Sequence, residues 1–194
     1  MCARIASALL AVLCLLTLPA LADVPDPPRE YYFLDQPGVL SEATEGEIFF
    51  ANRLLEAQCG AQLVVAVVNR LDGVPIDQYA MTLFNRWGIG DARKNNGLLL
   101  LMDIGGQDYY ALPGAGITGT FTPEVLAEIL FRTLEPDFAR GRYDAGARAC
   151  FEELFARVAK SQGTPLNAGM GLEAYEAWKR SNQGSTPWYV YEPI

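Results

Sequence analysis

The chain has 194 residues and no histidine, which excludes a Ser-His-Asp triad, a Cys-His dyad, a histidine general base and histidine-ligated zinc or haem. Its 23 acidic residues outnumber 15 Lys and Arg residues, giving a formal charge of −8 without any basic run. Because nucleic-acid phosphates demand clustered basic side chains, we expect no nucleic-acid partner.

The N-terminus has the pattern of a secretory signal peptide. Residues 5–18, IASALLAVLCLLTL, form an apolar run after Arg4, and the small-x-small tripeptide Ala20-Leu21-Ala22 follows shortly afterwards. About 14 apolar residues fall short of the roughly 20 that span a bilayer, which disfavours the alternative of an uncleaved anchor. We therefore expect residues 1–22 to be cleaved near Ala22, leaving an exported, periplasmic or secreted protein without a membrane span.

Three further segments follow the signal peptide. Residues 23–31 are proline-rich and predict an irregular tether. Residues 32–160 predict a single domain, and residues 161–194 predict a C-terminal helix followed by an aromatic tail. After cleavage, Cys59 and Cys150 would be the cysteines that remain. They are compatible with one disulfide in an oxidising compartment or with two buried thiols, and the sequence leaves both alternatives open.

The domain begins with a helix and a buried strand. Ser41 followed by Glu42 and Glu45 indicates a helix N-cap with acids in the first turn, and Gly60 is expected to end that helix. Residues 61–68, AQLVVAVV, are short and almost continuously apolar, as in a strand that is covered on both faces.

Helix and strand patterns then alternate. A second helix is expected from Asp77 until Gly88, and residues 98–102, LLLLM, predict another buried strand. Residues 108–112 predict its antiparallel hairpin partner. Three further helices are expected, one starting at Thr122-Pro123-Glu124, one over about 144–160 and one over about 172–180. This order predicts an α/β fold, an α/β/α sandwich around a small mixed β-sheet.

Polar side chains border the two buried strands. Asp103 follows the second strand and Asp72 follows the first, so parallel strands would bring both to one edge of the sheet. Asp91 and Asn96 precede the second strand and are expected at the opposite edge. Carboxylate and amide oxygens are the ligands that Ca²⁺ prefers. The alternative is that each residue only caps a turn or a helix.

The chain resembles the TPM-domain family, which includes thylakoid-lumen proteins linked to photosystem II repair, an acetylcholine-receptor modulator and exported bacterial proteins. The resemblance implies an α/β/α sandwich, Ca²⁺ binding at an acidic site, and the weak acid phosphatase activity of plant lumenal relatives. Asp35 matches the family's acid before the first helix and joins Asp91, Asn96 and Asp103 as a candidate metal ligand. The segments that carry the resemblance are DQPGVLS at 35–41, GAQLVVAVV at 60–68, YAMTLFNRWGIG at 79–90, NNGLLLLM at 95–102, GAGI at 114–117 and PDFARGRYDAG at 136–146.

No nucleophile-base pair, Walker loop, Rossmann fingerprint or G-x-S-x-G elbow is present, so no nucleotide cofactor is expected. Two hypotheses follow. The first is a non-catalytic exported protein that binds a divalent cation and assists the assembly, maintenance or repair of envelope complexes, with another envelope protein as its partner. The alternative is a metal-assisted acid phosphatase of low activity, in which Arg70 would stabilise phosphoryl oxygens.

Overall fold

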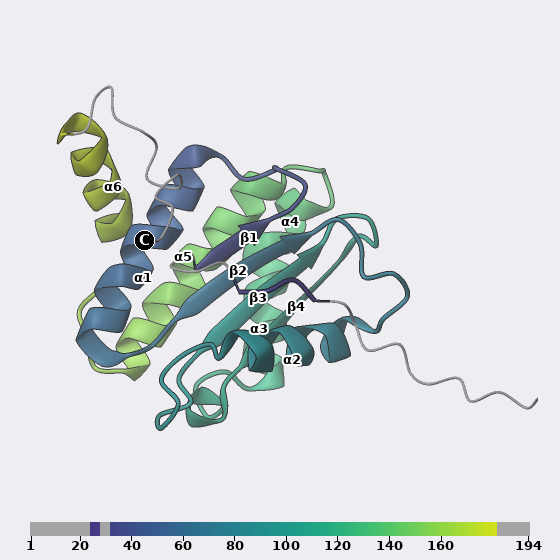
Figure 1. Ribbon diagram of the computed structural model, residues 1–194, viewed down its shortest axis with the longest axis horizontal. Coiled ribbons are helices and arrows are strands. Elements are labelled where there is room, and N and C mark those ends of the chain that lie inside the picture. The colour runs from purple at the N-terminus through teal and green to yellow at the C-terminus, as the bar shows by residue number, and fades with distance from the viewer. Residues whose placement is uncertain (1–23, 28–31, 182–194) are drawn as a thin grey trace, which may run out of the picture.

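The structure is a computed structural model that describes residues 24–27 and 32–181 (Figure 1). The expected signal peptide, part of the tether and the aromatic tail lie outside the described residues. Among the described residues, no helix combines the length and apolar character that crossing a membrane requires.

A four-stranded mixed sheet forms the centre of the fold (Figure 1). Its strands lie in the order β1 (Phe33–Asp35), β2 (Leu63–Val68), β3 (Leu98–Asp103) and β4 (Asp108–Pro113). The first three strands are parallel, and β4 pairs with β3 in the antiparallel sense. Every residue of β2 and β3 is buried, which explains why both strands are apolar throughout.

Helices cover both faces of the sheet. One face packs against α1 (Glu42–Cys59), α3 (Pro123–Ile129), α4 (Glu135–Phe138) and α5 (Tyr143–Ser161), which form the larger core with Val65, Val67, Leu100 and Met102. The opposite face packs against α2 (Ile76–Trp87) through Val64, Ala66, Leu99 and Leu101. The predicted α/β/α sandwich is confirmed.

Local signals explain most helix boundaries. The Ser41 side chain accepts from the Thr44 N–H at the start of α1, and Gly60 ends the helix in the left-handed conformation with φ 76°. The Thr122 side chain caps α3 in the same way, with Pro123 in the first turn. The helix that starts there is interrupted by a π-helical turn, η2 (Leu130–Leu134), a feature that the sequence pattern does not predict.

Two further elements differ from the sequence-based expectation. The short strand β1 was not expected, because three residues carry too little periodicity to be recognised. The C-terminal helix α6 (Gly169–Ser181) starts earlier than the predicted residue 172 and lies along α1 (Figure 1). The short helix η1 (Ala115–Ile117) follows β4.

Candidate functional site

The structure divides the four predicted metal ligands between the two ends of the sheet. Asp35 and Asp103 are the last residues of β1 and β3, at the carboxyl ends of the parallel strands. Asp91 and Asn96 lie in the loop that enters β3 at its other end. The length of β3 separates the two pairs by roughly 20 Å, so one ion cannot contact all four residues.

Asp35 and Asp103 also point to opposite faces of the sheet. Asp35 is level with Met102, whose side chain belongs to the α1/α5 core, whereas Leu101 belongs to the α2 core. Because side chains alternate along a strand, Asp103 shares the α2 face with Leu101. Although both residues lie at the carboxyl edge of the sheet, this edge does not bring the Asp35 and Asp103 carboxylates together.

Asp91 and Asn96 hold the loop before β3 in place. Asp91 Oδ1 accepts from the Lys94 and Arg93 N–H groups, and these bonds lower the pKa of Asp91. Asn96, only 1% exposed, accepts from the Asp91 N–H and donates to the Cys59 carbonyl and to Gln162 Oε1. These bonds fit the capping alternative for both residues.

Acidic side chains gather instead around Glu45, in the first turns of α1. Burial, reinforced by Asp35, Glu42 and Asp144, raises the pKa of Glu45 to about 7. Asp35 is held by two backbone donors, Gly38 N–H to Oδ1 at 3.1 Å and Leu40 N–H to Oδ2 at 2.7 Å. Asp144, from α5, accepts from the Ser41 N–H at 2.8 Å. We call Asp35, Glu42, Glu45 and Asp144 the acidic cluster.

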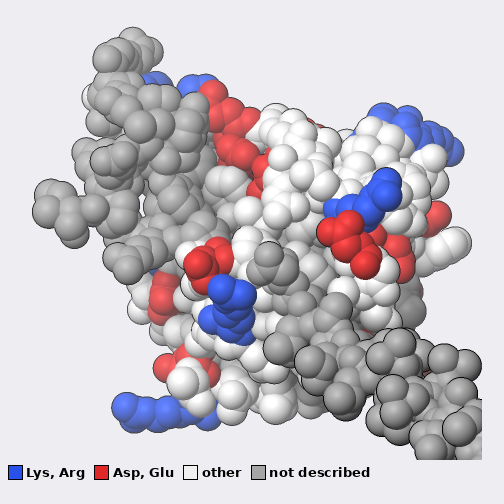
Figure 2. Space-filling model, turned by 45° about the vertical axis from the view of Figure 1, so that its right-hand side comes forward, with Lys and Arg blue, Asp and Glu red and all other residues white. Residues whose placement is uncertain are grey.

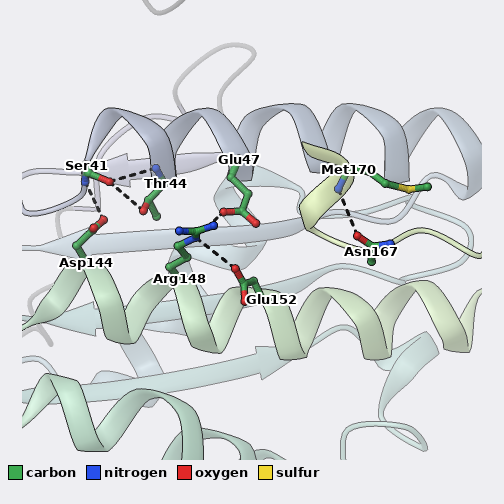
Figure 3. Close-up of polar contacts among 8 residues, drawn as sticks. All are labelled: Ser41, Thr44, Glu47, Asp144, Arg148, Glu152, Asn167 and Met170. Carbon is green, nitrogen blue, oxygen red and sulfur yellow. Dashed lines mark hydrogen bonds and ion pairs between the residues drawn. The ribbon is translucent and has the colours of Figure 1, made fainter. Parts of the chain in front are cut away.

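Asp144 of the acidic cluster belongs to a seam of polar contacts between α1 and α5, which also includes Glu47, Arg148 and Glu152 (Figure 3). Further along the seam, Glu47 Oε2 accepts from Arg148 Nε at 2.7 Å, and Glu152 lies 3.2 Å from the same nitrogen. Glu47 is 1% exposed, and its Oε1 is buried without a hydrogen-bond partner. Burial raises the pKa of Glu47, although the charge and the hydrogen bond of Arg148 oppose this shift. In this seam, Arg148 therefore compensates the negative charges of Glu47 and Glu152.

The acidic cluster is not a closed cage of ligands. Across residues 24–27 and 32–181, no three acidic or thiol side chains stand close enough to form a ready-made metal site. A cation at the cluster would keep part of its water shell, as Ca²⁺ and Mg²⁺ do where few carboxylates coordinate them directly. Burial is the main cause of the raised pKa of Glu45, and the charges of Asp35, Glu42 and Asp144 add to it; a cation would relieve this repulsive part.

The charges on one face of the molecule are dispersed (Figure 2). On the face drawn in Figure 2, acidic side chains lie in several separate groups with uncharged surface between them. Cys59 and Cys150 are free thiols and form no disulfide with each other; Cys150 is buried, as the second alternative expects, whereas Cys59 is only partly buried. Burial raises the pKa of Cys150 to about 12, which leaves this thiol unreactive at neutral pH.

The sequence identified one member of the acidic cluster, Asp35. Glu42 and Glu45 were recognised only as first-turn acids of a helix. Asp144 approaches Ser41 across 103 residues of chain, a contact that no local pattern encodes. A useful signal was available in Glu42 and Glu45, the next acids in the chain after Asp35, and in Asp144, which opens the expected helix over about 144–160.

Solved bacterial domains share this fold. The N-terminal domain of a P. gingivalis protein is 22% identical, with a TM-score of 0.62 over 70% of this chain and 86% of that one. The BA42 protein of Bizionia argentinensis is 16% identical, with a TM-score of 0.52 over 66% and 92%. The N-terminal domain of cg2496 from Corynebacterium glutamicum is 15% identical, with a TM-score of 0.50 over 73% and 86%. At these identities the likeness establishes the fold alone.

The family model of the TPM domain matches residues 33–157. This match covers most of the chain, and the protein belongs to the TPM-domain family. No curated protein matches the chain. Helix α6 lies outside the matched residues.

Proposed function

We propose that this protein is an exported, non-catalytic TPM-domain protein that binds a divalent cation, most readily Ca²⁺, at the acidic cluster. In this role it assists the assembly, maintenance or repair of envelope protein complexes through another envelope protein. The observation that carries the cation proposal is the gathering of Asp35, Glu42 and Asp144 around Glu45 at the start of α1, where their charges add to burial in raising the pKa of Glu45 to about 7. A cation supplies the positive charge that this group lacks.

Export is supported by the apolar run at residues 5–18 and the small residues around Ala22. A non-catalytic role is supported by the chemistry of the cluster, which consists of carboxylates that accept from backbone N–H groups and, at Glu42, from the Tyr175 hydroxyl. Carboxylates held in this way bind cations but supply no activated nucleophile.

Calorimetric titration with CaCl₂ at pH 7.5 tests the proposal. Asp35→Asn and Asp144→Asn should each weaken binding at least fivefold, because each removes one charge from the cluster. Asp91→Asn is the matched control, since it removes the same charge at the other end of the sheet, and it should leave the affinity unchanged. Equal effects of all three variants, or no binding heat with the unaltered protein, would refute the proposal.

Metal-assisted phosphate-ester hydrolysis is the second candidate. It is favoured by Arg70, whose side chain lies against Gly105 in the turn that follows Asp103. The acidic side chain of Asp103 and the basic side chain of Arg70 therefore lie at the same carboxyl edge of the sheet. Hydrolysis of p-nitrophenyl phosphate at pH 5.5 that is lost on chelation and in both Arg70→Ala and Asp103→Asn would establish this activity. A rate equal to the blank would remove it.

A further inference from the structure

An apolar groove runs along the free edge of the sheet, between β4 and α3, on a part of the molecule that the acidic cluster does not reach. It encloses about 440 Å³. Its walls include Tyr110, Ala111 and Pro113 of β4, together with Phe121, Leu126 and Leu130. Its described lining residues carry no charge, which is unusual on a protein with a net charge of −8.

The backbone of β4 offers hydrogen bonds to this groove. The Gly114 N–H donates to the Gly97 carbonyl, so residues 114, 112, 110 and 108 direct their backbone groups toward β3. Tyr109, Ala111 and Pro113 therefore direct theirs away from the sheet. The Asp108 side chain accepts from the Tyr109 N–H, and Pro113 has no N–H. The outward groups of Ala111 have no backbone partner within the described residues.

An exposed aromatic residue extends the apolar surface beyond the groove. Phe131 is 73% exposed and lies one helical turn after Ala127, which is itself part of the groove wall. The π-helical turn η2 buries both Leu130 and Leu134 and leaves Phe131 pointing outward. Single-turn π-helical segments inside α-helices are frequent at functional sites.

Acidic side chains flank both ends of the groove. Asp108 lies at the start of β4, and Glu135 contacts Tyr109 closely enough to contribute to the raised pKa of this tyrosine. Glu124 lies at the other end, in the first turn of α3. A ligand that fits the groove therefore has an apolar centre and basic ends.

We propose that this groove binds an extended segment of another protein, in which alternate side chains are apolar and Lys or Arg residues flank them. The segment adds to β4 as a further strand and hydrogen-bonds to Ala111. Its apolar side chains occupy the groove against Leu126, and its basic residues lie near the acids at either end. Strand addition of this kind takes affinity from the backbone and specificity from alternate side chains. The proposal does not depend on cation binding.

The test is NMR titration of the ¹⁵N-labelled protein with the capped peptide Lys-Val-Thr-Val-Thr-Val-Lys. We expect shift changes centred on Ala111, Leu126 and Phe131, with a dissociation constant below about 1 mM. Ala127→Arg places a long cationic side chain in the groove wall and should weaken binding at least tenfold. Ala57→Arg, the same change at an exposed position of α1, should not alter binding.

A second peptide, with Glu in place of both Lys residues, should bind at least fivefold more weakly. Absence of shift changes with the Lys peptide, or equal binding by Ala127→Arg, would overturn the proposal. Concentration-dependent dimerisation through β4 in the absence of peptide, abolished by Ala127→Arg, would also overturn it in favour of a second copy of this chain.

Discussion

The Tyr175 hydroxyl donates to Glu42 Oε1 over 2.8 Å and so joins α6 to the first turn of α1. The Tyr175 ring is completely buried and lies over Gly46, where any Cβ atom would collide with it. One residue of a helix outside the TPM-domain match thereby reaches a member of the acidic cluster. The position of α6 depends on this contact and on a second one, at Gly171.

Gly171→Ala should loosen α6. A Cβ atom there would lie 2.5 Å from both the Ala51 nitrogen and the Glu47 carbonyl oxygen, which are backbone atoms and cannot rotate aside. Overpacking of this kind costs about 1–3 kcal/mol. We expect faster amide hydrogen exchange over 169–181 and a lower unfolding midpoint. Gly119→Ala is the control, because a Cβ at Gly119 meets no atom within 4 Å. Unchanged exchange in α6 would contradict this account of the contact.

Much of the fold was predictable because its signals are local. The cap at Ser41, the stop at Gly60 and the buried strands at 63–68 and 98–103 each depend on short stretches of sequence. The strand β1 escaped prediction because it exists through pairing with β2, and three residues alone do not specify a strand.

The candidate site was less predictable. Asp35 was identified through a family resemblance, while Asp91 and Asn96 were grouped with it because their side chains are of the same chemical type. Residue type does not reveal that the Asn96 amide group donates hydrogen bonds to the Cys59 carbonyl and to Gln162 Oε1. The approach of Asp144 to α1 depends on the packing of two helices that are far apart in the chain.

Arg148→Ala should strongly destabilise the protein, because it leaves the buried Glu47 without its ionic partner. Since Arg148 is itself partly exposed, we expect a loss of about 2–3 kcal/mol in the free energy of unfolding, near the lower end for broken buried pairs. The pKa of Glu47 is already raised, so protonation can neutralise the orphaned carboxylate. Urea unfolding should therefore show a smaller loss at pH 5 than at pH 8.

Arg157→Ala is the control for Arg148→Ala. Arg157 has similar exposure and pairs with Glu153 on the surface of α5 at 3.4 Å. We expect a loss of about 0.5 kcal/mol or less, as is usual for exposed pairs. Comparable losses in the two variants would show that Glu47 does not depend on Arg148.

Asn96→Ala should destabilise the protein without altering cation affinity. The change removes three hydrogen bonds at a buried position and leaves the Asp91 N–H unpaired. We expect a loss of about 2–3 kcal/mol, measured by urea unfolding. A fall in Ca²⁺ affinity greater than twofold in the folded variant would contradict this expectation and indicate that Asn96 is a metal ligand.

The raised pKa of Glu45 predicts that the free energy of unfolding falls as the pH rises. Its folded-state pKa, about 7, exceeds its ordinary value of 4.5, so the folded protein holds the proton more tightly than the unfolded chain. This contribution is complete below pH 4.5 and is lost as the pH rises through 7. Glu45→Gln should remove the decline in unfolding midpoint between pH 5 and pH 8.

Glu124→Gln is the comparison variant, because the pKa of Glu124 is shifted in the opposite direction from that of Glu45. The Thr122 side chain lowers the pKa of Glu124, so its contribution is present above the unfolded pKa and is lost as the pH falls. This variant should leave the decline between pH 5 and pH 8 intact. If Glu45→Gln and Glu124→Gln gave the same profile, Glu45 would not be the titrating group.

Proton release on Ca²⁺ binding tests the central claim most directly. A cation at the acidic cluster must displace the proton that Glu45 holds near neutral pH, because both compete for the same negative charge. Calorimetric titration at pH 6.5 in two buffers of different ionisation enthalpy measures this release. The account predicts a fraction of a proton released per Ca²⁺ bound by the unaltered protein and none by Glu45→Gln. Binding with no proton release, or with the same release in Glu45→Gln, would contradict it.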